Sequence, residues 1–336
     1  MPSSSRLTIV VPGDDPVQIA GSPHLERLKP YGEVILYPDR PASLEEKIAR
    51  ARDADILINS RGAVTWPGEA LRALPRLRMI TTCSIGTDMI DLAAARELGI
   101  VVCNQPGQTA PVVAEHAFGL MCALAKRAAF QTAELKAGRW TRRENLFLQG
   151  KTLGVVGTGA TGAEMARLGR ALGMQVIAWT YHPSPERAEA LGVRFVELYE
   201  LLQNSDVVSL HLKLTADSRG LIGARELARM KPGALLINCA RGGVVDTPAL
   251  VEALNRGHLG GAALDVYDQE PLPPDHPLLS CEQVILTPHA ADQTPEGIDL
   301  LNEGAVDNVI AFLEGRPRNV VCMEPFKEND RCQGPA

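Results

Sequence analysis

The chain lacks a basic excess and any membrane-length apolar run, and each absence excludes a class of protein. Its 40 Asp and Glu residues outnumber its 34 Lys and Arg residues, which gives a formal net charge of −6. This balance argues against nucleic acid or an anionic membrane as the main partner. No stretch approaches the ~20 apolar residues of a membrane span, and the start, MPSSSRLTIVVPG, lacks the long apolar core of a signal peptide.

The cysteines lack CxxC pairs and metal-ligand spacing. The seven are Cys83, Cys103, Cys122, Cys239, Cys281, Cys322 and Cys332, and several of them lie in apolar, strand-like runs. Such cysteines are typical of buried free thiols in a reducing compartment. We therefore expect a cytoplasmic protein without a metal site. The hydrophobic fraction of 45% and the charged fraction of 22% are those of a soluble globular protein.

Two series of alternating strand and helix patterns follow one another. In the first hundred residues, strand-like runs such as RLTIVVPG, ADILINS and RMITTC alternate with short helical segments. One of these, SLEEKIARA, begins with Ser43 and has Glu46 three residues later, which predicts a capping box. Alternation of this kind indicates a parallel sheet covered on both faces. From Lys151 onward a second series contains seven strand-like runs, so 336 residues are expected to form two α/β domains.

A glycine pattern opens the second series. The apolar run Thr152 to Val156 is followed by Gly157, Gly159 and Gly162, and then by a helical segment that stops at Gly173. In a dinucleotide site the first glycine permits a tight turn, the second lets a pyrophosphate approach the backbone, and the third lets helix and strand pack closely. The helix N-terminus would face the phosphates. The strand-glycine-helix order favours a nucleotide site over a purely structural turn.

The segment between the two series has a different character. Residues 105–127 predict one long apolar helix with small residues, which we interpret as a hinge and interface helix. The following polar and basic segment contains Trp140 and Phe147, which suggests an arm that reaches a partner subunit; an ordinary surface loop is the alternative. A further amphipathic helix is expected over QTPEGIDLLNEGAVDNVIAFLEGRP, and residues 322–336 are expected to be a disordered tail.

Three polar residues stand where late strands of the second series end. They are Arg241 in NCARGGVVD, Glu270 in LDVYDQEP and His289 in ILTPHAA. The carboxyl ends of parallel strands form the ligand crevice of such a sheet, so these residues make a plausible acid/base site. Taken singly, Arg241 could cap a helix, Glu270 could be a solvated loop acid and His289 could be a turn residue.

These motifs together resemble the D-isomer specific 2-hydroxyacid dehydrogenase family. The resemblance spans about Leu7 to Val321 and rests on GTGATG, LHLKLTADSRGLI, MKPGALLINCARGGVVD, GAALDVYDQEP and TPHAA in that order. It implies two Rossmann-like/flavodoxin-like parallel-sheet domains, with the cofactor domain inserted into a split substrate domain. The implied ranges are 1–104 with 291–321 for the substrate domain and 105–290 for the NAD(P)-binding domain. A homodimer acting on a small 2-oxo or D-2-hydroxy acid is also implied.

The resemblance assigns roles to the three strand-end residues. Arg241 would bind the substrate carboxylate and polarise the keto oxygen, and His289 would be the general acid for keto reduction and the base in reverse. Glu270 would hold the imidazole in one tautomer and stabilise its cation. The residues expected to contact the dinucleotide are Gly157, Thr158, Gly159, Ala160, Thr161, Gly162, Thr180, Tyr181, His182, His211, Leu212, Lys213, Cys239, Ala240, Arg241, Asp265 and His289.

The first series would supply the remaining substrate contacts. CSIGTDMID matches a family loop whose backbone N–H groups, at Ile85 and Gly86, bind a carboxylate. NSRGAVT matches the loop on the other side of the family's cleft. Asn59 aligns with a position that is arginine in phosphoglycerate dehydrogenases, and Arg61 follows two residues later. The arginine expected to bind a phosphate is therefore displaced, which puts 3-phosphoglycerate in doubt as substrate.

One departure concerns the cofactor. NAD-preferring members have an aspartate at the end of the second strand, which holds the ribose diol. Here MQVIAW leads into Thr180, Tyr181 and His182, with no acid. With His182, Arg187 and Lys213 nearby, a 2′-phosphate becomes tolerable; alternatively, Thr180 alone binds the diol of NAD. Two functional alternatives also stay open: a formate dehydrogenase of the same fold, which would have glutamine in place of Glu270, and a dinucleotide-sensing regulator like the C-terminal-binding corepressors.

Overall fold

The chain forms two compact α/β units, and the computed structural model describes residues 6–322. Unit 1 contains the described residues up to Thr109 and from Thr294 onward, and unit 2 is Ala110–Gln293. Unit 1 is therefore split in sequence, and unit 2 is inserted into it. The chain passes between the units a few residues after the predicted positions 104 and 290.

The sheet of unit 1 has the flavodoxin-like strand order. Five parallel strands are arranged β5-β4-β3-β1-β2, with an antiparallel β13 beside β5. Their bounds are β1 Leu7–Val11, β2 Gly32–Leu36, β3 Ile56–Asn59, β4 Met79–Thr82, β5 Val101–Cys103 and β13 Val320–Cys322. The parallel order 2-1-3-4-5 belongs to the doubly wound folds. The sequence missed β13, and Cys322, which was expected to begin the tail, ends this strand; the remaining tail residues lie outside the described range.

Helices lie on both faces of this sheet. They are η1 Pro23–Leu28, α1 Leu44–Ala51, α2 Gly68–Arg72, α3 Leu92–Glu97 and α11 Pro295–Leu313. The predicted α11 packs against η1 and β4, and its Leu301 and Val309 belong to a fully buried apolar cluster with strand residues. At the start of α1, Ser43 Oγ accepts the Glu46 N–H at 3.2 Å. The predicted capping box is only half formed, because the Glu46 carboxylate accepts the Ala42 N–H at 2.7 Å.

Unit 2 contains a seven-stranded parallel sheet. The order is β12-β11-β10-β9-β6-β7-β8. The strands are β6 Thr152–Val156, β7 Gln175–Trp179, β8 Arg194–Phe195, β9 Val207–Leu210, β10 Leu235–Asn238, β11 Gly261–Leu264 and β12 Val284–Leu286. This is the dinucleotide-binding order 3-2-1-4-5-6 with one further strand, and the order reverses between β6 and β9. The seven predicted strands and the two-sheet fold class are thus confirmed.

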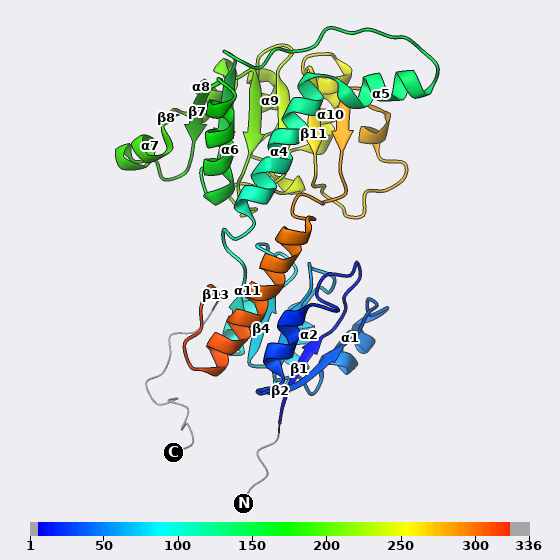
Figure 1. Cartoon of the computed structure of the whole chain (residues 1–336), viewed down its shortest axis with the longest axis vertical. Coiled ribbons are helices and arrows are strands. Elements are labelled where there is room, and N and C mark those ends of the chain that lie inside the picture. The colour runs from blue at the N-terminus through cyan, green and yellow to red at the C-terminus, as the bar shows by residue number, and fades with distance from the viewer. Residues whose placement is uncertain (1–5, 323–336) are drawn as a thin grey trace, which may run out of the picture. The chain divides into compact units, whose positions relative to one another are not determined.

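The long apolar helix α4, Ala110–Ala125, covers this sheet. It packs against α6 and against β10 and β11 (Figure 1). Ala114, Ala117 and Met121 have no exposed surface. The sequence favoured a hinge and interface helix over a sheet cover, but α4 does cover the sheet; it is apolar on several sides because one side meets the sheet and another meets α6. The other helices are α5 Ala128–Lys136, α6 Ala160–Ala171, α7 Pro185–Leu191, α8 Leu198–Asn204, α9 Ala224–Arg229, η2 Gly242–Val244, α10 Thr247–Asn255 and η3 Pro277–Ser280.

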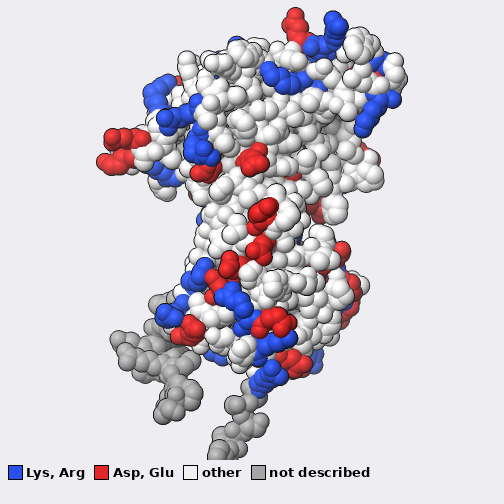
Figure 2. All heavy atoms as spheres, in the orientation of Figure 1, with Lys and Arg blue, Asp and Glu red and all other residues white. Residues whose placement is uncertain are grey.

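One face of the described chain has mixed charge (Figure 2). Lys and Arg side chains alternate with Asp and Glu on the face in Figure 2. None of the helices in residues 6–322 combines the length and apolar composition needed to span a bilayer. Six cysteines in this range are free, and Cys83, Cys103, Cys281 and Cys322 are buried.

Candidate functional site

The glycine loop between β6 and α6 has the geometry that its spacing predicts. Gly157 has φ +90°, in the region that glycine tolerates best. A Cβ at Gly162 would lie 2.0 Å from the Gly157 carbonyl oxygen, so only glycine lets α6 approach the loop this closely. At Gly159, the N-cap of α6, an added Cβ would meet nothing within 4 Å. The middle glycine therefore borders open space, where a ligand can approach the backbone.

Polar groups around this loop fit a dinucleotide pyrophosphate. The Thr158 side chain is 3% exposed, and its Oγ1 has no hydrogen-bond partner among the described residues. Ala160 and Thr161 form the first turn of the twelve-residue α6, where backbone N–H groups and the helix dipole favour an anion. An unpartnered hydroxyl beside an open, anion-favouring helix start fits bound phosphate.

The remaining predicted cofactor residues follow neighbouring strands of the same sheet. Thr180, Tyr181 and His182 follow β7, His211, Leu212 and Lys213 follow β9, and Cys239, Ala240 and Arg241 follow β10. His211 Nε2 lies 2.9 Å from Ser209 Oγ, and burial lowers the pKa of His211 to about 4, so its ring is neutral. Burial raises the pKa of the Cys239 thiol, with a smaller effect from Asp265, which keeps it protonated.

The loop after β7 offers no carboxylate to a ribose. The Tyr181 ring packs edge-on against Trp179, with ring centroids 4.7 Å apart. From α7, Arg187 Nη2 donates a hydrogen bond to the Thr158 carbonyl oxygen, so a guanidinium touches the glycine loop. The cation predicted from the sequence is thus close to the loop that would hold the phosphates.

A histidine–carboxylate pair links the loop after β11 to the turn after β12. His289 Nδ1 lies 2.7 Å from Glu270 Oε2, and the Tyr267 N–H donates to Glu270 Oε1 at 2.9 Å. Burial raises the pKa of Glu270, but the hydrogen bonds from His289 and Tyr267, with the charges of His289 and Arg241, outweigh it. The net result is a pKa below the ordinary value, so Glu270 is ionised at neutral pH.

Arg241 follows β10 and begins η2. Its Nη1 donates to the neighbouring Ala240 carbonyl oxygen at 2.7 Å, and its charge contributes to the lowered pKa of Glu270. The Asn238 amide holds this loop, donating to the Arg241 carbonyl oxygen at 3.0 Å. The structure therefore brings the three predicted acid/base residues to the carboxyl edge of one sheet.

Asp265 holds the turn that contains His289. Its carboxylate accepts the Thr287 hydroxyl at 2.5 Å and the N–H groups of Ala290 and Ala291 at 2.9 and 3.0 Å. Burial alone would raise the pKa of Asp265. Hydrogen bonds from His116, Thr287 and Ala290 lower it by more, so the pKa of Asp265 lies below its ordinary value. Sequence reasoning missed His116, Thr287 and Tyr267. No local signal points to His116, which is 171 residues from Thr287 along the chain.

The predicted substrate loops of unit 1 follow β3 and β4. Asn59 is 1% exposed, and both ends of its amide are engaged within its own loop: Nδ2 donates to the Val64 carbonyl and Oδ1 accepts from Trp66 Nε1. Asn59 is therefore a loop-supporting residue in place of the expected substrate contact. Arg61 has φ +40°. Among residues 6–322, no hydrogen bond is formed by the N–H groups of Ile85 and Gly86, the two predicted carboxylate donors.

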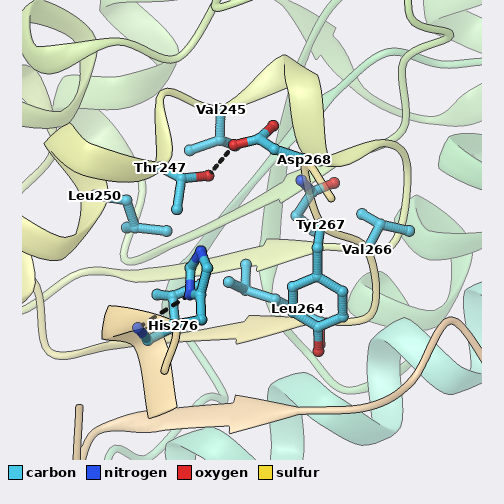
Figure 3. A pocket seen from close by; sticks show the side chains of 11 residues that line it. Val245, Thr247, Leu250, Leu264, Val266, Tyr267, Asp268 and His276 are labelled. Atoms are coloured by element: carbon cyan, nitrogen blue, oxygen red, sulfur yellow. Dashed lines mark hydrogen bonds between the residues drawn. The ribbon is translucent and has the colours of Figure 1, made fainter. Parts of the chain in front are cut away.

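A small cavity lies within unit 2. It holds about 10 Å³, room for about one water, and is lined by residues including Asn238, Thr247, Tyr267, Asp268 and His276 (Figure 3). Thr247 Oγ1 donates to Asp268 Oδ2 at 2.5 Å, and His276 Nδ1 accepts the Leu278 N–H. The cavity is too small for a 2-oxo acid or a dinucleotide, so it is not the candidate site. Within the described residues, no group of three His, Cys, Asp or Glu side chains is arranged to hold a metal ion.

Comparisons with known proteins agree with this geometry. The family model for the D-isomer specific 2-hydroxyacid dehydrogenase, NAD binding domain, matches residues 118–291. A glyoxylate reductase from Korarchaeum cryptofilum is 38% identical over 313 residues, which is 90% of this chain and 93% of that protein. A D-3-phosphoglycerate dehydrogenase from Archaeoglobus fulgidus is 40% identical over 267 residues, which is 78% of this chain but only 50% of that protein.

A solved structure is similar over nearly the whole chain. It is an NADPH-dependent glyoxylate/hydroxypyruvate reductase from Sinorhizobium meliloti in complex with NADP and malonate. The TM-score is 0.83 at 30% sequence identity, covering 96% of this chain and 100% of that one.

Proposed function

This chain belongs to the D-isomer specific 2-hydroxyacid dehydrogenase family, and from that premise we propose that it reduces a small, unphosphorylated 2-oxo acid of the glyoxylate or hydroxypyruvate type. The family places it among NAD(P)-dependent oxidoreductases, which exchange a hydride between a nicotinamide dinucleotide and a 2-oxo acid or its D-2-hydroxy acid. Unit 2 would be the cofactor domain, and unit 1 the substrate domain.

The single observation that supports the catalytic proposal most directly is the 2.7 Å contact between His289 Nδ1 and Glu270 Oε2. An ionised carboxylate only accepts hydrogen bonds, so Nδ1 bears a proton and Nε2 is the nitrogen that exchanges one with substrate. When bound, the nicotinamide supplies the hydride. His289 donates a proton to the keto oxygen, and Glu270 stabilises the imidazolium from which that proton leaves. Arg241 binds the substrate carboxylate and polarises the keto group.

The unit 1 loops support an unphosphorylated substrate. Asn59 stands where phosphoglycerate dehydrogenases have arginine, and its buried amide is held by Val64 and Trp66. The N–H groups of Ile85 and Gly86 suit one carboxylate. The glyoxylate reductase matches this chain over nearly its full length, whereas the phosphoglycerate dehydrogenase is about twice as long as its matched part.

For the cofactor, the proposal is a preference for NADP(H) over NAD(H). The segment Thr180 to His182 has no carboxylate to repel a 2′-phosphate, and Arg187 touches the glycine loop. The Sinorhizobium meliloti reductase was solved with NADP. Thr180→Asp should reverse the preference, and Arg187→Ala should weaken NADPH binding more than NADH binding. Arg167→Ala, which removes an exposed partner of Glu164 on α6, is the control. Equal losses for both cofactors in Arg187→Ala would contradict the assignment.

For assembly, the proposal is a homodimer in the cytoplasm. Trp140 and Phe147 are 78% and 66% exposed in the segment after α5, and no residue of α5 itself is buried. Large apolar side chains exposed this far are typical of a surface that a second copy covers. The double variant Trp140→Ser, Phe147→Ser should sediment as a monomer. A wild-type chain that sediments as a monomer at micromolar concentration would refute the proposal that this segment contacts a second copy.

A panel of 2-oxo acids tests the activity. Glyoxylate, hydroxypyruvate, pyruvate and phosphohydroxypyruvate are offered with NADPH and with NADH, and cofactor oxidation is followed. We expect kcat/KM to be highest for glyoxylate or hydroxypyruvate with NADPH. Preference for the phosphorylated acid would overturn the substrate assignment. Dinucleotide binding without turnover of any acid would instead favour the sensor alternative, and formate oxidation would favour the formate dehydrogenase alternative.

A further inference from the structure

A chain of hydrogen bonds lies directly behind the His289 turn and begins on a different element. His116, on α4, has Nε2 3.2 Å from Thr287 Oγ1 and 3.6 Å from Asp265 Oδ1. Thr287 Oγ1 in turn lies 2.5 Å from Asp265 Oδ1. The Asp265 carboxylate then receives the N–H groups of Ala290 and Ala291. The network thus begins on the helix that covers the sheet and ends at the residues next to His289.

The direction of each hydrogen bond follows from which atoms bear a proton and which can only accept one. The ionised Asp265 carboxylate can only accept, so the Thr287 hydroxyl proton must point to it. The oxygen of Thr287 is then left as an acceptor toward His116, so Nε2 of His116 must be the protonated ring nitrogen. All donors therefore point toward one carboxylate, which is wholly buried.

His289 has a backbone conformation that requires such support. Its φ is +51°, a region that residues other than glycine seldom adopt, and it persists where surrounding contacts fix it. Asp265 binds residues on both sides of this position: Thr287 before it, and Ala290 and Ala291 after it. The His289 N–H also donates to the Thr287 carbonyl oxygen at 3.0 Å. Asp265 therefore holds the backbone turn from which the imidazole projects, while Glu270 binds the imidazole itself.

We propose that His116, Thr287 and Asp265 are positioning residues, which hold the left-handed turn of His289 so that its imidazole faces the keto oxygen. This rests on the proposed role of His289 as proton donor. It gives Asp265 a function through the backbone of the neighbouring turn, and it gives α4, far away in sequence, a part in catalysis. None of the three needs to touch the substrate.

Matched threonine variants test the proposal. Thr287→Val keeps the shape but removes the hydroxyl, and Thr287→Ser restores the hydroxyl. Thr247→Val is the control, because Thr247 also donates to an aspartate at 2.5 Å in unit 2, but not beside His289. Misplacement of a catalytic group can cost about 100-fold in rate. We expect kcat for 2-oxo acid reduction to fall about 100-fold in Thr287→Val and to recover to within about threefold in Thr287→Ser.

In the same Thr287→Val variant, NADPH affinity should change less than about twofold, since the glycine loop is untouched, and Thr247→Val should keep wild-type kcat. His116→Phe, which keeps a ring but removes one hydrogen bond of the network, should lower kcat in the same direction by about tenfold. A structural role alone would lower the melting temperature of these variants and leave kcat of the folded fraction unchanged. A kcat within threefold of wild type in Thr287→Val overturns the proposal.

A readout that does not need turnover separates this proposal from the proposed function. Amide hydrogen exchange is followed in the peptide that contains Ala290 and Ala291. Exchange there should be about tenfold faster in Thr287→Val than in wild type or Thr247→Val, because the carboxylate that holds these amides has lost a donor. Unchanged exchange overturns the proposal. If wild type reduces no 2-oxo acid, the proposed function fails, and the exchange measurement alone decides whether the network holds the turn.

Discussion

Glu270 and His289 are 19 residues apart in sequence, and their side chains meet at 2.7 Å. The other carboxylate oxygen of Glu270 accepts the Tyr267 N–H. One carboxylate therefore joins the loop after β11 to the turn after β12, and it fixes which imidazole nitrogen bears the proton. Because the folded state favours ionised Glu270, this contact links stability to pH as well as orienting the ring.

Glu270→Gln should make stability less dependent on acid pH. The pKa of Glu270 is lower in the folded chain than its ordinary value of 4.5, so ionised Glu270 stabilises the folded state. This stabilisation is complete above about pH 4.5 and is lost as the pH falls through the folded pKa. Urea unfolding at several pH values should show a difference between wild type and variant that is constant at neutral pH and shrinks in acid. The same substitution in a His289→Asn background should show a smaller pH-dependent part, and an identical profile there would contradict the pairing.

His289→Asn should remove most turnover while leaving dinucleotide binding nearly intact. The imidazole stands at a strand end beside Glu270, and general acid/base groups contribute roughly 10²–10⁴-fold in rate. Steady-state kinetics and NADPH fluorescence titration measure the two effects separately. A variant that reduces keto acids at near-normal rates would exclude His289 from proton transfer.

Gly159→Val should abolish cofactor affinity without preventing folding. A Cβ at Gly159 meets no protein atom within 4 Å, so the added side chain would occupy the space into which the pyrophosphate fits. Gly119→Val is the matched control: Gly119, on α4, also has open space around its added Cβ and should keep normal cofactor binding. Cofactor titration of both variants, with a thermal melt to verify folding, measures this. Equal affinities in the two would refute the pyrophosphate site.

Arg241→Lys should impair both KM and kcat. A guanidinium offers a rigid planar fork of donors, whereas lysine offers one compact charge, so the substitution keeps the charge and loses the two-oxygen geometry. The carboxylate contact and the contact to the developing oxyanion would weaken together. Arg241→Ala should be worse still. If Arg241 only supports the loop through Ala240, the lysine variant will melt earlier and show wild-type kinetics in its folded fraction.

Local patterns predicted much of the fold. The glycine spacing, the Ser43 cap and the seven strands of unit 2 each depend on residues close in sequence, and the structure has them. The predicted helices formed, but what each helix packs against was harder to predict. The apolar surface of α4 gives no sign of whether it meets a sheet or a second domain, and its contacts with β10 and β11 show that it covers the sheet of unit 2.

In the candidate site, too, only the residues marked by a local sequence pattern could be predicted. Arg241, Glu270 and His289 could be found because strand ends mark the ligand edge of a parallel sheet. The support behind His289 could not, because His116 and Thr287 are separated by most of unit 2 and meet only after folding. Asn59 was misassigned for a related reason: its position suited substrate, but Trp66 and Val64 fold back and occupy its amide. The strand β13 was also missed, because a three-residue edge strand is too short to give an alternating pattern in the sequence.

The split of unit 1 also sets the order in which the two units can fold on the ribosome. Residues 110–293 must be made before α11 appears, which takes roughly 10 to 40 s at ordinary synthesis rates. During that time β1 to β5 exist without the helix that supplies Leu301, Ala305 and Val309 to their apolar face. Unit 2 is continuous and complete once Gln293 has emerged. Until α11 emerges, the nascent chain therefore displays the apolar face of an unfinished sheet, and Ile9, Val11 and Ile58 are among the residues that a chaperone would meet there.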